Sequence, residues 1–397
     1  MKRFERHLLA GSFFALCLAA CQTVPEAETA QQSNSVASQE VYDLVNRSEV
    51  VATVKSKNVA VELERQALEW GYTLKKQEKL AGLNLYLLTF DCPPGVDPKE
   101  ASLELERLQP KSSVGELHKY SFNSARASQV NFRTPKTFAN EMLQWPEKAC
   151  ESLVRIGIID GGLSETFLSQ TSAQIHKASF IDHVPSEAAI MHGTSIGAIL
   201  TDSSRLTGVE LYSAEVVSQD KDGDNYSSPT SILKALNWMI LNDVKVVNIS
   251  LSGPPNKVLE SALKISAEKG LIIVAAVGNQ GQYSKPQYPA AYQTVLAATA
   301  VDVDGDIYDK AVRGNHVDFS APGVDVYVNT ANKGQYISGT SIAAPFLTAA
   351  IASSSSLSDR DEVILNFARS ATDLGPKGKD TIFGRGLINA KNLCETG

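Results

Sequence analysis

A serine set among small residues near the C-terminal end has the surroundings that a nucleophile needs. Residues 337–346 read ISGTSIAAPF, and Ser341 stands where the apolar part of this run begins. A serine in the first turn of a helix has an exposed hydroxyl and an unpaired backbone N–H above the positive end of the helix dipole. Pro345 is expected to fall in that first turn, where proline is tolerated. Because serine is also a common N-cap, catalysis requires a base and an acid elsewhere.

A carboxylate and a histidine upstream could supply the acid and the base. Residues 154–162 (VRIGIIDGG) read as a short buried strand that ends in Asp160, and open α/β sheets place their chemistry at strand ends. Residues 191–200 (MHGTSIGAIL) place His192 at the mouth of another helix of small residues. Taken singly, Asp-Gly is a common turn and a lone histidine is more often a satisfied polar residue. Together they give the chain order Asp, His, Ser.

These segments resemble the three catalytic motifs of the subtilisin-like serine proteases (subtilases), which have this chain order. One position differs, because Gly161 follows Asp160 where the family usually has serine or threonine. This loses a hydroxyl near the acid but keeps the acid. Four further segments agree with the family, in its order, and the resemblance spans roughly residues 150 to 397. They are residues 247–253 (VNISLSG), 272–279 (IIVAAVGN), 288–290 (YPA) and 318–323 (DFSAPG).

The resemblance implies peptide-bond hydrolysis by an Asp-His-Ser triad without a cofactor. A serine hydroxyl is a weak nucleophile at neutral pH and needs a base to accept its proton. His192 would accept that proton and pass it to the leaving amine, while Asp160 would hold the imidazole in the productive tautomer. The Asn279 amide and the Ser341 backbone N–H would stabilise the oxyanion. Without the resemblance, Asn279 reads as a turn residue.

The resemblance also implies where substrate binds. Ser250, Leu251 and Ser252 lie in the strand that is similar to the substrate-pairing strand of the family. Gln287 stands where the family usually has a glycine on the floor of the primary specificity pocket. A long amide there should shorten the pocket or offer polar contacts, so we expect a preference away from large aromatic residues just before the cleaved bond.

Apolar runs of strand length alternate with helical patterns in the same region. This alternation predicts an α/β, three-layer fold with a mostly parallel sheet and helices on both faces. The strand-like runs are 154–159, 207–217, 244–251, 271–277 and 294–301, and the helical patterns are 190–202, 229–242 and 256–269.

The N-terminus reads as a secretory signal. Residues 8–20 are almost wholly apolar but too few to span a bilayer, and they follow positive charge. The last residues of the 1–21 segment resemble a bacterial lipobox, which would lipidate Cys21; a standard signal with an incidental cysteine is the alternative. Gln22 after the cysteine favours the periplasmic side of the outer membrane, and residues 22–40 read as a flexible tether.

A second small domain is expected over residues 41–122, before a linker at 123–149 and the protease domain at 150–397. Its pattern predicts a small α+β ferredoxin-like domain, β-α-β-β-α-β with one strand unassigned. The assigned elements are 49–54, 59–70, 83–90, 97–108 and 113–122. The domain resembles subtilase propeptides, which inhibit the enzyme through their last residues, and a generic periplasmic docking module is the alternative. A cut between about 122 and 150 would detach the protease from its anchor.

The cysteines fit an oxidising compartment. Cys17 would leave with the signal and Cys21 would carry lipid. Cys150 and Cys394 bracket the protease region, so we expect them to form a disulfide, with a Cys92–Cys150 pair as the alternative.

Two further features argue against other partners. The net charge of −7, with scattered Lys and Arg, indicates no nucleic-acid surface. Residues 220–224 (DKDGD) resemble part of a calcium loop but lack the bidentate glutamate, so they read as a solvated loop. We therefore assign no metal site, although structural calcium stays possible.

Three function classes fit these observations. The favoured one is a serine endopeptidase of the cell envelope, acting on protein or peptide substrates. Its other partners would be its own N-terminal domain, as an intramolecular inhibitor, and the membrane, through a lipid. The alternatives are a non-catalytic docking scaffold on the same fold and a hydrolase of non-peptide acyl substrates. A degenerate triad would signal the scaffold, and every triad position is filled.

Overall fold

The computed structural model describes residues 43–122, 135–181, 184–330, 334–354 and 359–394. The predicted signal peptide, the lipobox residue Cys21 and the tether lie outside the described residues, as does the 123–134 part of the predicted linker. Within the described ranges, no helix has the length and apolar character that a membrane span requires.

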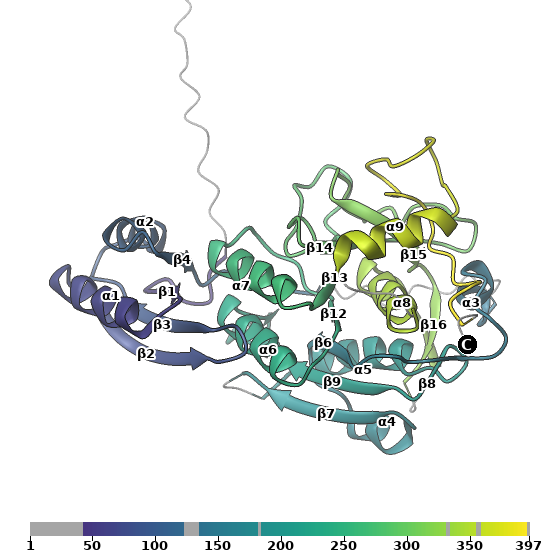
Figure 1. Ribbon diagram of the computed structural model, residues 1–397, viewed down its shortest axis with the longest axis horizontal. Coiled ribbons are helices and arrows are strands. Elements are labelled where there is room, and N and C mark those ends of the chain that lie inside the picture. The colour runs from purple at the N-terminus through teal and green to yellow at the C-terminus, as the bar shows by residue number, and fades with distance from the viewer. Residues whose placement is uncertain (1–42, 123–134, 182–183, 331–333, 355–358, 395–397) are drawn as a thin grey trace, which may run out of the picture. The chain divides into compact units, whose positions relative to one another are not determined.

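A seven-stranded parallel sheet forms the centre of residues 150–397, the region predicted to be the protease domain and called the protease region below (Figure 1). Its order is β15-β14-β13-β12-β6-β9-β7. The bounds are β6 (Ile156–Asp160), β7 (Gln174–Ser179), β9 (Glu210–Glu215), β12 (Val246–Ile249), β13 (Ile272–Ala276), β14 (Val295–Val301) and β15 (Val317–Pro322). The predicted parallel α/β sheet is confirmed. The edge strand β7 (QIHKAS) was missed because its side chains are mostly polar and partly exposed.

Helices cover both faces of this sheet. Successive side chains of a strand point to opposite faces, and both sets are apolar here, so each face has to be covered. Val246 packs in the same cluster as α5 and α8, and Val247 in that of α6 and α7. The helices are α3 (Phe138–Met142), α4 (Glu165–Gln170), α5 (Glu187–Leu200), α6 (Pro229–Leu241), α7 (Lys257–Glu268), α8 (Thr340–Ala352) and α9 (Arg360–Ser370). Short strand pairs complete the region: β5 (Cys150–Glu151) with β8 (Leu206–Thr207), β10 (Ser218–Gln219) with β11 (Asn225–Tyr226), and β16 (Val326–Asn329) with β17 (Gly334–Ile337).

The N-terminal domain is a four-stranded antiparallel sheet with two helices. Its sheet order β2-β3-β1-β4 and its β-α-β-β-α-β sequence match the ferredoxin-like prediction. The elements are β1 (Glu49–Val54), α1 (Lys57–Glu69), β2 (Thr73–Leu80), β3 (Leu85–Asp91), α2 (Pro98–Leu108) and β4 (Ser112–Glu116). The strand left unassigned is β2 (TLKKQEKL), an edge strand whose residues are mostly exposed and polar.

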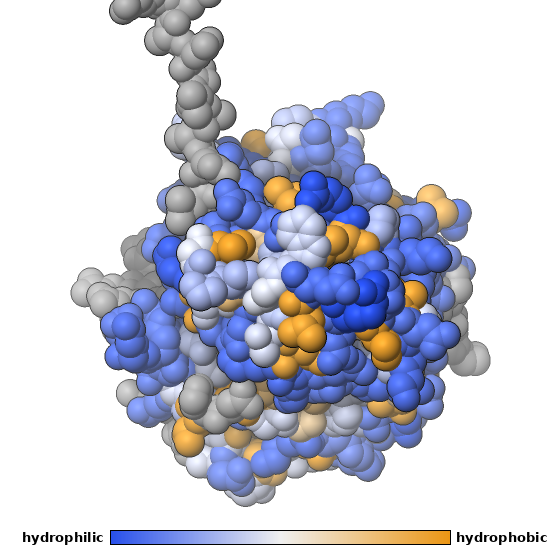
Figure 2. All heavy atoms as spheres, turned by 90° about the vertical axis from the view of Figure 1, so that its left-hand side faces the viewer, coloured by the Kyte–Doolittle hydropathy of each residue, from blue (hydrophilic) through white to orange (hydrophobic). Residues whose placement is uncertain are grey.

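The two faces of this small sheet pack differently. Val50 and Ala52 face α1 and α2, whereas Val51 joins the cluster that contains α6 and α7 of the protease region. Hydrogen bonds add to the apolar contact: the Gly82 N–H donates to Asn237 Oδ1 over 2.7 Å. Figure 2 looks onto the side of the molecule that carries the N-terminal domain, where hydrophilic residues cover most of the surface and apolar ones lie between them. The N-terminal domain therefore shares part of its core with the protease region.

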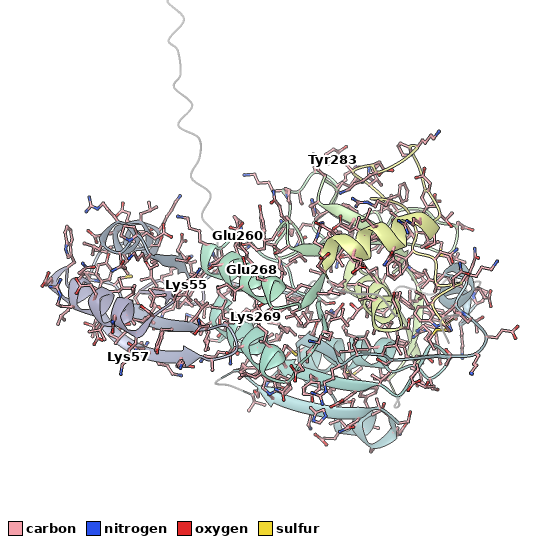
Figure 3. All side chains as sticks on the ribbon, in the orientation of Figure 1. Lys55, Lys57, Glu260, Glu268, Lys269 and Tyr283 are labelled. Carbon is pink, nitrogen blue, oxygen red and sulfur yellow. A yellow bond between two sulfur atoms is a disulfide. The ribbon has the colours of Figure 1, made fainter. Side chains whose placement is uncertain are left out.

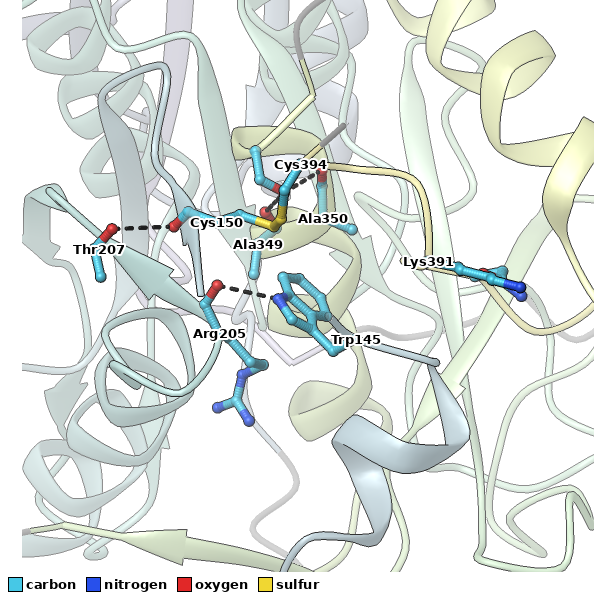
Figure 4. Close-up of a disulfide and its surroundings, with 10 residues drawn as sticks. Trp145, Cys150, Arg205, Thr207, Ala349, Ala350, Lys391 and Cys394 are labelled. Atoms are coloured by element: carbon cyan, nitrogen blue, oxygen red, sulfur yellow. Dashed lines mark hydrogen bonds between the residues drawn. A yellow bond between two sulfur atoms is a disulfide. The ribbon is translucent and has the colours of Figure 1, made fainter. Parts of the chain in front are cut away.

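A disulfide joins Cys150 in β5 to Cys394, with 5.3 Å between the two Cα atoms (Figure 4). Beside it, the Trp145 indole N–H donates to the Arg205 carbonyl oxygen over 3.0 Å. Cys92 is free and half-buried, and burial raises the pKa of its thiol to about 11. The alternative Cys92–Cys150 pair is not formed.

Replacing Cys150 and Cys394 together by serine is expected to lower the free energy of unfolding by about 2–5 kcal/mol. The disulfide closes a loop with a sequence separation of 244 residues, which restricts the unfolded chain strongly in the chain-entropy model. Urea unfolding under non-reducing conditions measures the change, with Cys92→Ser as the control. Unchanged stability, with free thiols found at 150 and 394 in the wild type, would argue against the bond.

Candidate active site

The predicted site residues meet at the carboxyl edge of the parallel sheet. Strands β13, β12 and β6 are neighbours in the sheet. Asp160 is the last residue of β6, Ser250 directly follows β12, and Asn279 follows β13 by three residues. Parallel strands bring their carboxyl ends to one edge, so three segments far apart in the sequence arrive at one place.

Asp160 and His192 are joined by a short hydrogen bond in a buried setting. His192 Nδ1 lies 2.7 Å from Asp160 Oδ1, and the Gly161 backbone N–H donates to the same oxygen over 2.7 Å. Bonding to a carboxylate requires Nδ1 to carry the proton, which leaves Nε2 as the acceptor in the neutral ring. Nε2 is buried and has no hydrogen-bond partner among the described residues. The imidazole is therefore oriented as a base.

Glycines allow this approach. A Cβ at Gly161 would lie 2.0 Å from the Ala189 carbonyl oxygen in α5, and one at Gly193 would lie 2.4 Å from the Gly161 carbonyl oxygen. The strand end and the helix thus pack backbone against backbone. The family's usual side chain at position 161 has no room here, which explains the departure seen in the sequence.

Helix α5 begins earlier than predicted, so His192 lies in its second turn and not at its mouth. Ser186 is the N-cap, and its hydroxyl accepts from the Ala189 N–H over 3.0 Å. The prediction followed the apolar residues alone and missed the Ser-Glu start, a standard N-terminal signal.

A Gly161→Ser substitution, which restores a residue usual in the family, is expected to destabilise this chain by about 1–3 kcal/mol. It should also lower kcat/KM, because α5 must shift and carry His192 away from Asp160. Thermal unfolding and peptide hydrolysis measure both effects. Gly162→Ala is the matched control, since its Cβ would come close only to the movable Glu215 carboxylate and would meet Ile190 at ordinary van der Waals distance. Wild-type stability and activity in Gly161→Ser would contradict this explanation.

Ser341 is the second residue of α8, directly after Thr340 and the N-cap Gly339. The Thr340 N–H donates to Asn279 Oδ1 and the Ile342 N–H to the Gly339 carbonyl oxygen, each over 3.0 Å. In the described part of the chain, the Ser341 N–H has no such partner. Among the same residues, no hydrogen bond joins Ser341 Oγ to His192, although the helices α5 and α8 that carry them pack together.

Pro345 is the sixth residue of α8 and lies in the second turn, not in the first as predicted. Proline there cannot donate to the carbonyl oxygen of Ser341, four residues earlier. Ser250 Oγ donates to that oxygen over 3.1 Å and accepts from Asn248 Nδ2 over 2.8 Å. The freed carbonyl thus ties α8 to the end of β12, and Ser250 lies beside Ser341.

The Asn279 side chain is held by a residue that the prediction did not assign. Asn279 Oδ1 accepts from the Thr340 N–H over 3.0 Å and from the Thr340 hydroxyl over 2.9 Å. Thr340 Oγ1 in turn accepts from the Gly278 N–H over 3.1 Å. The oxygen end of the amide therefore faces α8, and the Nδ2 end points away from Thr340. The position of Thr340 directly before Ser341 was the only sign in the sequence that it belongs to the site.

The last residues of the N-terminal domain, 119–122, lie across this edge as an extended segment. Ser121 and Ser252 exchange two backbone hydrogen bonds of 2.9 Å each. Tyr120 and Ser227 do the same, over 2.9 and 2.6 Å. The Phe122 ring stacks on the His192 ring with 4.3 Å between centroids. The resemblance to propeptides implied that the last residues of this domain, up to Phe122, would reach the site, but no pattern in the sequence pointed to Ser227.

The segment that contains Ser250, Leu251 and Ser252 lines this groove only in part. Ser252 pairs with Ser121, whereas the Leu251 side chain is buried in the apolar cluster of α6 and α7. Tyr120 is fully buried, and its hydroxyl donates to the Pro254 carbonyl oxygen over 2.7 Å. Burial raises the pKa of the Tyr120 hydroxyl well above its usual value, so it stays a donor.

Gln287 lies beside the segment that holds Asn279. Its Cγ is 3.0 Å from where a Cβ of Gly278 would stand, and its Nε2 donates to the Lys285 carbonyl oxygen over 2.9 Å. The same loop carries Tyr283, whose side chain is almost fully exposed (Figure 3). The role of Gln287 in specificity stays a prediction.

The 220–224 segment forms a tight turn between β10 and β11. Asp220 Oδ1 accepts from the backbone N–H groups of Asp222 and Asp224. Its Oδ2 accepts from Lys119 Nζ over 2.9 Å. Among the residues that the structure describes, no three His, Cys, Asp or Glu side chains gather as metal ligands would.

Known proteins are similar to this chain in sequence and in fold. A sequence model of the subtilase family (peptidase S8) matches residues 152–386. The chain belongs to the subtilase family. The minor extracellular protease Epr of Bacillus subtilis (strain 168) is 30% identical over 259 residues, 60% of this chain and 38% of Epr. This subtilase thus spans less than two fifths of that relative's length. Subtilisin BL of Lederbergia lenta is 31% identical over 255 residues, 60% of this chain and 89% of its own.

Solved structures agree on the fold. The epidermin leader peptide processing serine protease EpiP from Staphylococcus aureus superposes with a TM-score of 0.62 and 15% identity. The likeness covers 88% of this subtilase and 98% of EpiP. A lanthipeptide protease gives a TM-score of 0.53 with 21% identity, over 66% of this chain and 92% of its own. The EpiP match is longer than the 152–386 segment, so it extends beyond the region that the family model matches.

Proposed function

We propose that this subtilase is a serine endopeptidase with Asp160, His192 and Ser341 as its catalytic triad. The buried 2.7 Å contact between His192 Nδ1 and Asp160 carries the proposal, because it leaves Nε2 to accept a proton. The start of α8 at the same sheet edge supports Ser341 as the nucleophile. The relative Epr, which is named as a protease, supports a peptide substrate.

In the proposed reaction, His192 Nε2 takes the Ser341 proton while Oγ bonds to the substrate carbonyl carbon. The carbonyl oxygen becomes an oxyanion, which the Asn279 amide and the Ser341 N–H stabilise. The imidazolium, held by Asp160, then gives its proton to the leaving amine as the C–N bond breaks. Water attacks the remaining acyl-enzyme through the same base, which releases the acid product and restores Ser341.

Labelling with a fluorophosphonate probe, followed by casein hydrolysis, tests this function. The probe reacts with an activated serine, so we expect a single labelled site at Ser341 and hydrolysis of casein. A chain that takes no label after its N-terminal domain has been removed would be a scaffold. A chain that takes label at Ser341 but cuts no peptide would be a hydrolase of other acyl substrates.

We further propose that the N-terminal domain inhibits the enzyme within the same chain. A substrate strand cannot pair with Ser252 and Ser227 while Ser121 and Tyr120 occupy them. The ring of Phe122 also covers one face of the His192 imidazole. Full activity would then require the domain to leave.

We also propose that the chain is lipid-anchored through Cys21 in the cell envelope, on the periplasmic side of the outer membrane. The lipid would precede the inhibitory domain, so a cut within residues 123–149 would free the protease from its anchor. Radiolabelled palmitate should enter the wild type but not Cys21→Ser. Equal labelling of both proteins, or none of either, would contradict lipidation.

A further inference from the structure

One ion pair in the occupied groove has no part in the proposed chemistry. Lys119 directly precedes the Tyr120–Ser227 pair, and its Nζ lies 2.9 Å from Asp220 Oδ2. The contact is sheltered, because the Lys119 side chain is 20% exposed and that of Asp220 15%. The groove therefore accommodates a charged side chain at this position of the bound segment.

The Asp220 carboxylate is held by its own hairpin as well as by Lys119. Asp222 and Asp224 donate their backbone N–H groups to Oδ1 over 3.0 and 2.9 Å, which turns Oδ2 toward Lys119. The hydrogen bond from Lys119 lowers the pKa of Asp220, so the carboxyl stays ionised. Ser227 follows directly after the same hairpin and pairs with the backbone of Tyr120. One hairpin thus presents both the backbone partner and the charge.

Only part of this arrangement would leave with the N-terminal domain. Asp43 Oδ2 is also 3.0 Å from Lys119 Nζ, but Asp43 belongs to that domain and is 65% exposed. Asp220 and the Tyr226 ring, 5.7 Å from Nζ, belong to the protease region and would remain. The emptied groove would keep a carboxylate and an aromatic face, which together suit a cation.

We infer that Asp220 is a specificity-determining residue that selects substrates with lysine or arginine where Lys119 now lies. This inference rests on the proposed endopeptidase function. A bound substrate and the 250–252 segment would be antiparallel, so one chain advances while the other goes back. The substrate residue two positions after the one opposite Ser252 therefore lies opposite Ser250. Ser250 contacts the Ser341 carbonyl, so this residue would offer the attacked carbonyl. The cleaved bond would therefore follow the fourth residue after the basic one.

The chain's own sequence offers the test substrate. Residues 115–128 read GELHKYSFNSARAS, and the fourth residue after Lys119 is Asn123, which lies outside the described residues. A synthetic peptide of this sequence should be cut between the residues that correspond to Asn123 and Ser124. An asparagine before the cut also agrees with the preference expected from Gln287.

The experiment compares this peptide with versions that carry Arg, Gln or Glu in place of Lys119. Enzyme competent for cleavage is counted with a fluorophosphonate probe, and kcat/KM is measured for each peptide. The wild type should prefer Lys or Arg over Gln by about tenfold, the size expected of one charge-assisted hydrogen bond. Asp220→Asn keeps the Oδ1 acceptor for the turn but loses the charge, so this ratio should fall to about one. Asp222→Asn, in the same turn but without contact to Lys119, is the matched control and should keep the wild-type ratio.

A charge exchange gives an independent measurement. Asp220→Lys should prefer the Glu peptide over the Lys peptide, which a merely destabilised groove would not do. Equal rates for Lys and Gln peptides in the wild type, an unchanged ratio in Asp220→Asn, or a cut at another bond would overturn the inference while leaving the protease intact. If the labelled enzyme cuts none of the peptides, the endopeptidase proposal itself fails, and this inference with it.

Discussion

A Ser341→Ala variant is expected to lose proteolysis by about a millionfold in kcat and to persist as an uncut chain. The substitution removes the attacking oxygen, while Ser341 Oγ makes no hydrogen bond in the described part of the structure, so folding should be unchanged. The magnitude is the one known for the nucleophile of subtilisin. Hydrolysis of the 115–128 peptide and gel analysis of the purified chain over time measure the two effects.

Ser266→Ala serves as the matched control for the Ser341 variant. Ser266 is a buried serine whose hydroxyl donates to the Ala262 carbonyl oxygen within α7, away from the sheet edge. The Ser266→Ala variant should cut itself and the peptide at the wild-type rate, after correction for the amount of folded protein. If purified Ser341→Ala protein cuts itself as fast as the wild type does, Ser341 is not the nucleophile.

Self-cutting alone would not empty the groove. Val51 and other residues of the small sheet share an apolar cluster with α6 and α7, and the Tyr120 ring is fully buried. These contacts do not depend on the covalent link. A cut after the bound segment would therefore leave the N-terminal domain in place until it dissociates, unfolds or is degraded. Activation of this subtilase should accordingly proceed in two steps.

The sequence predicted the central elements because burial leaves a readable pattern. Strands covered on both faces are mostly apolar, so β12, β13 and β14 fall within predicted runs, and β6 exceeds its run of 154–159 only by Asp160. Asp160, Ser250 and Asn279 stand at or just after the ends of such strands, and His192 and Ser341 lie in helices of small residues. The edge strands β2 and β7 were missed because polar side chains on an exposed strand do not differ from those of a loop. The edge strand β15 was also outside the predicted runs, although it is buried, because Asp318 and Ser320 interrupt its apolar pattern.

The sequence could not predict how distant segments meet. The hydrogen bond from Thr340 to Asn279 joins residues 61 positions apart, and the one from Ser250 to Ser341 joins residues 91 positions apart. Pattern reports which residues are buried but not which polar atoms pair. For the same reason, residues 220–224 read as a solvated loop, although Asp220 binds Lys119 from the other domain. The reason for glycine at position 161 also lies in another segment, because the Ala189 carbonyl oxygen occupies the space that a Cβ would need.

Replacing Asn279 by aspartate is expected to lower kcat by about 10²–10³-fold with little change in KM. The magnitude is again the one known for subtilisin, for the loss of its oxyanion-hole asparagine. Aspartate keeps an oxygen that can accept from the Thr340 N–H and hydroxyl, so the packing against α8 should survive. It loses the amide donor and places a negative charge where the oxyanion forms. Steady-state kinetics and thermal unfolding separate the catalytic effect from a structural one.

Thr340→Val is the companion variant, because it removes the hydroxyl that holds Asn279 Oδ1 and keeps the amide donor itself. Oxyanion stabilisation depends on a donor that is already oriented, so a freer Asn279 side chain should lower kcat by less than Asn279→Asp does, roughly tenfold. In the double variant, the two losses should not add, because both act through the same amide. If the two losses in kcat multiply in the double variant, Thr340 acts on Ser341 by another route. If Asn279→Asp has the wild-type kcat, Asn279 does not stabilise the oxyanion.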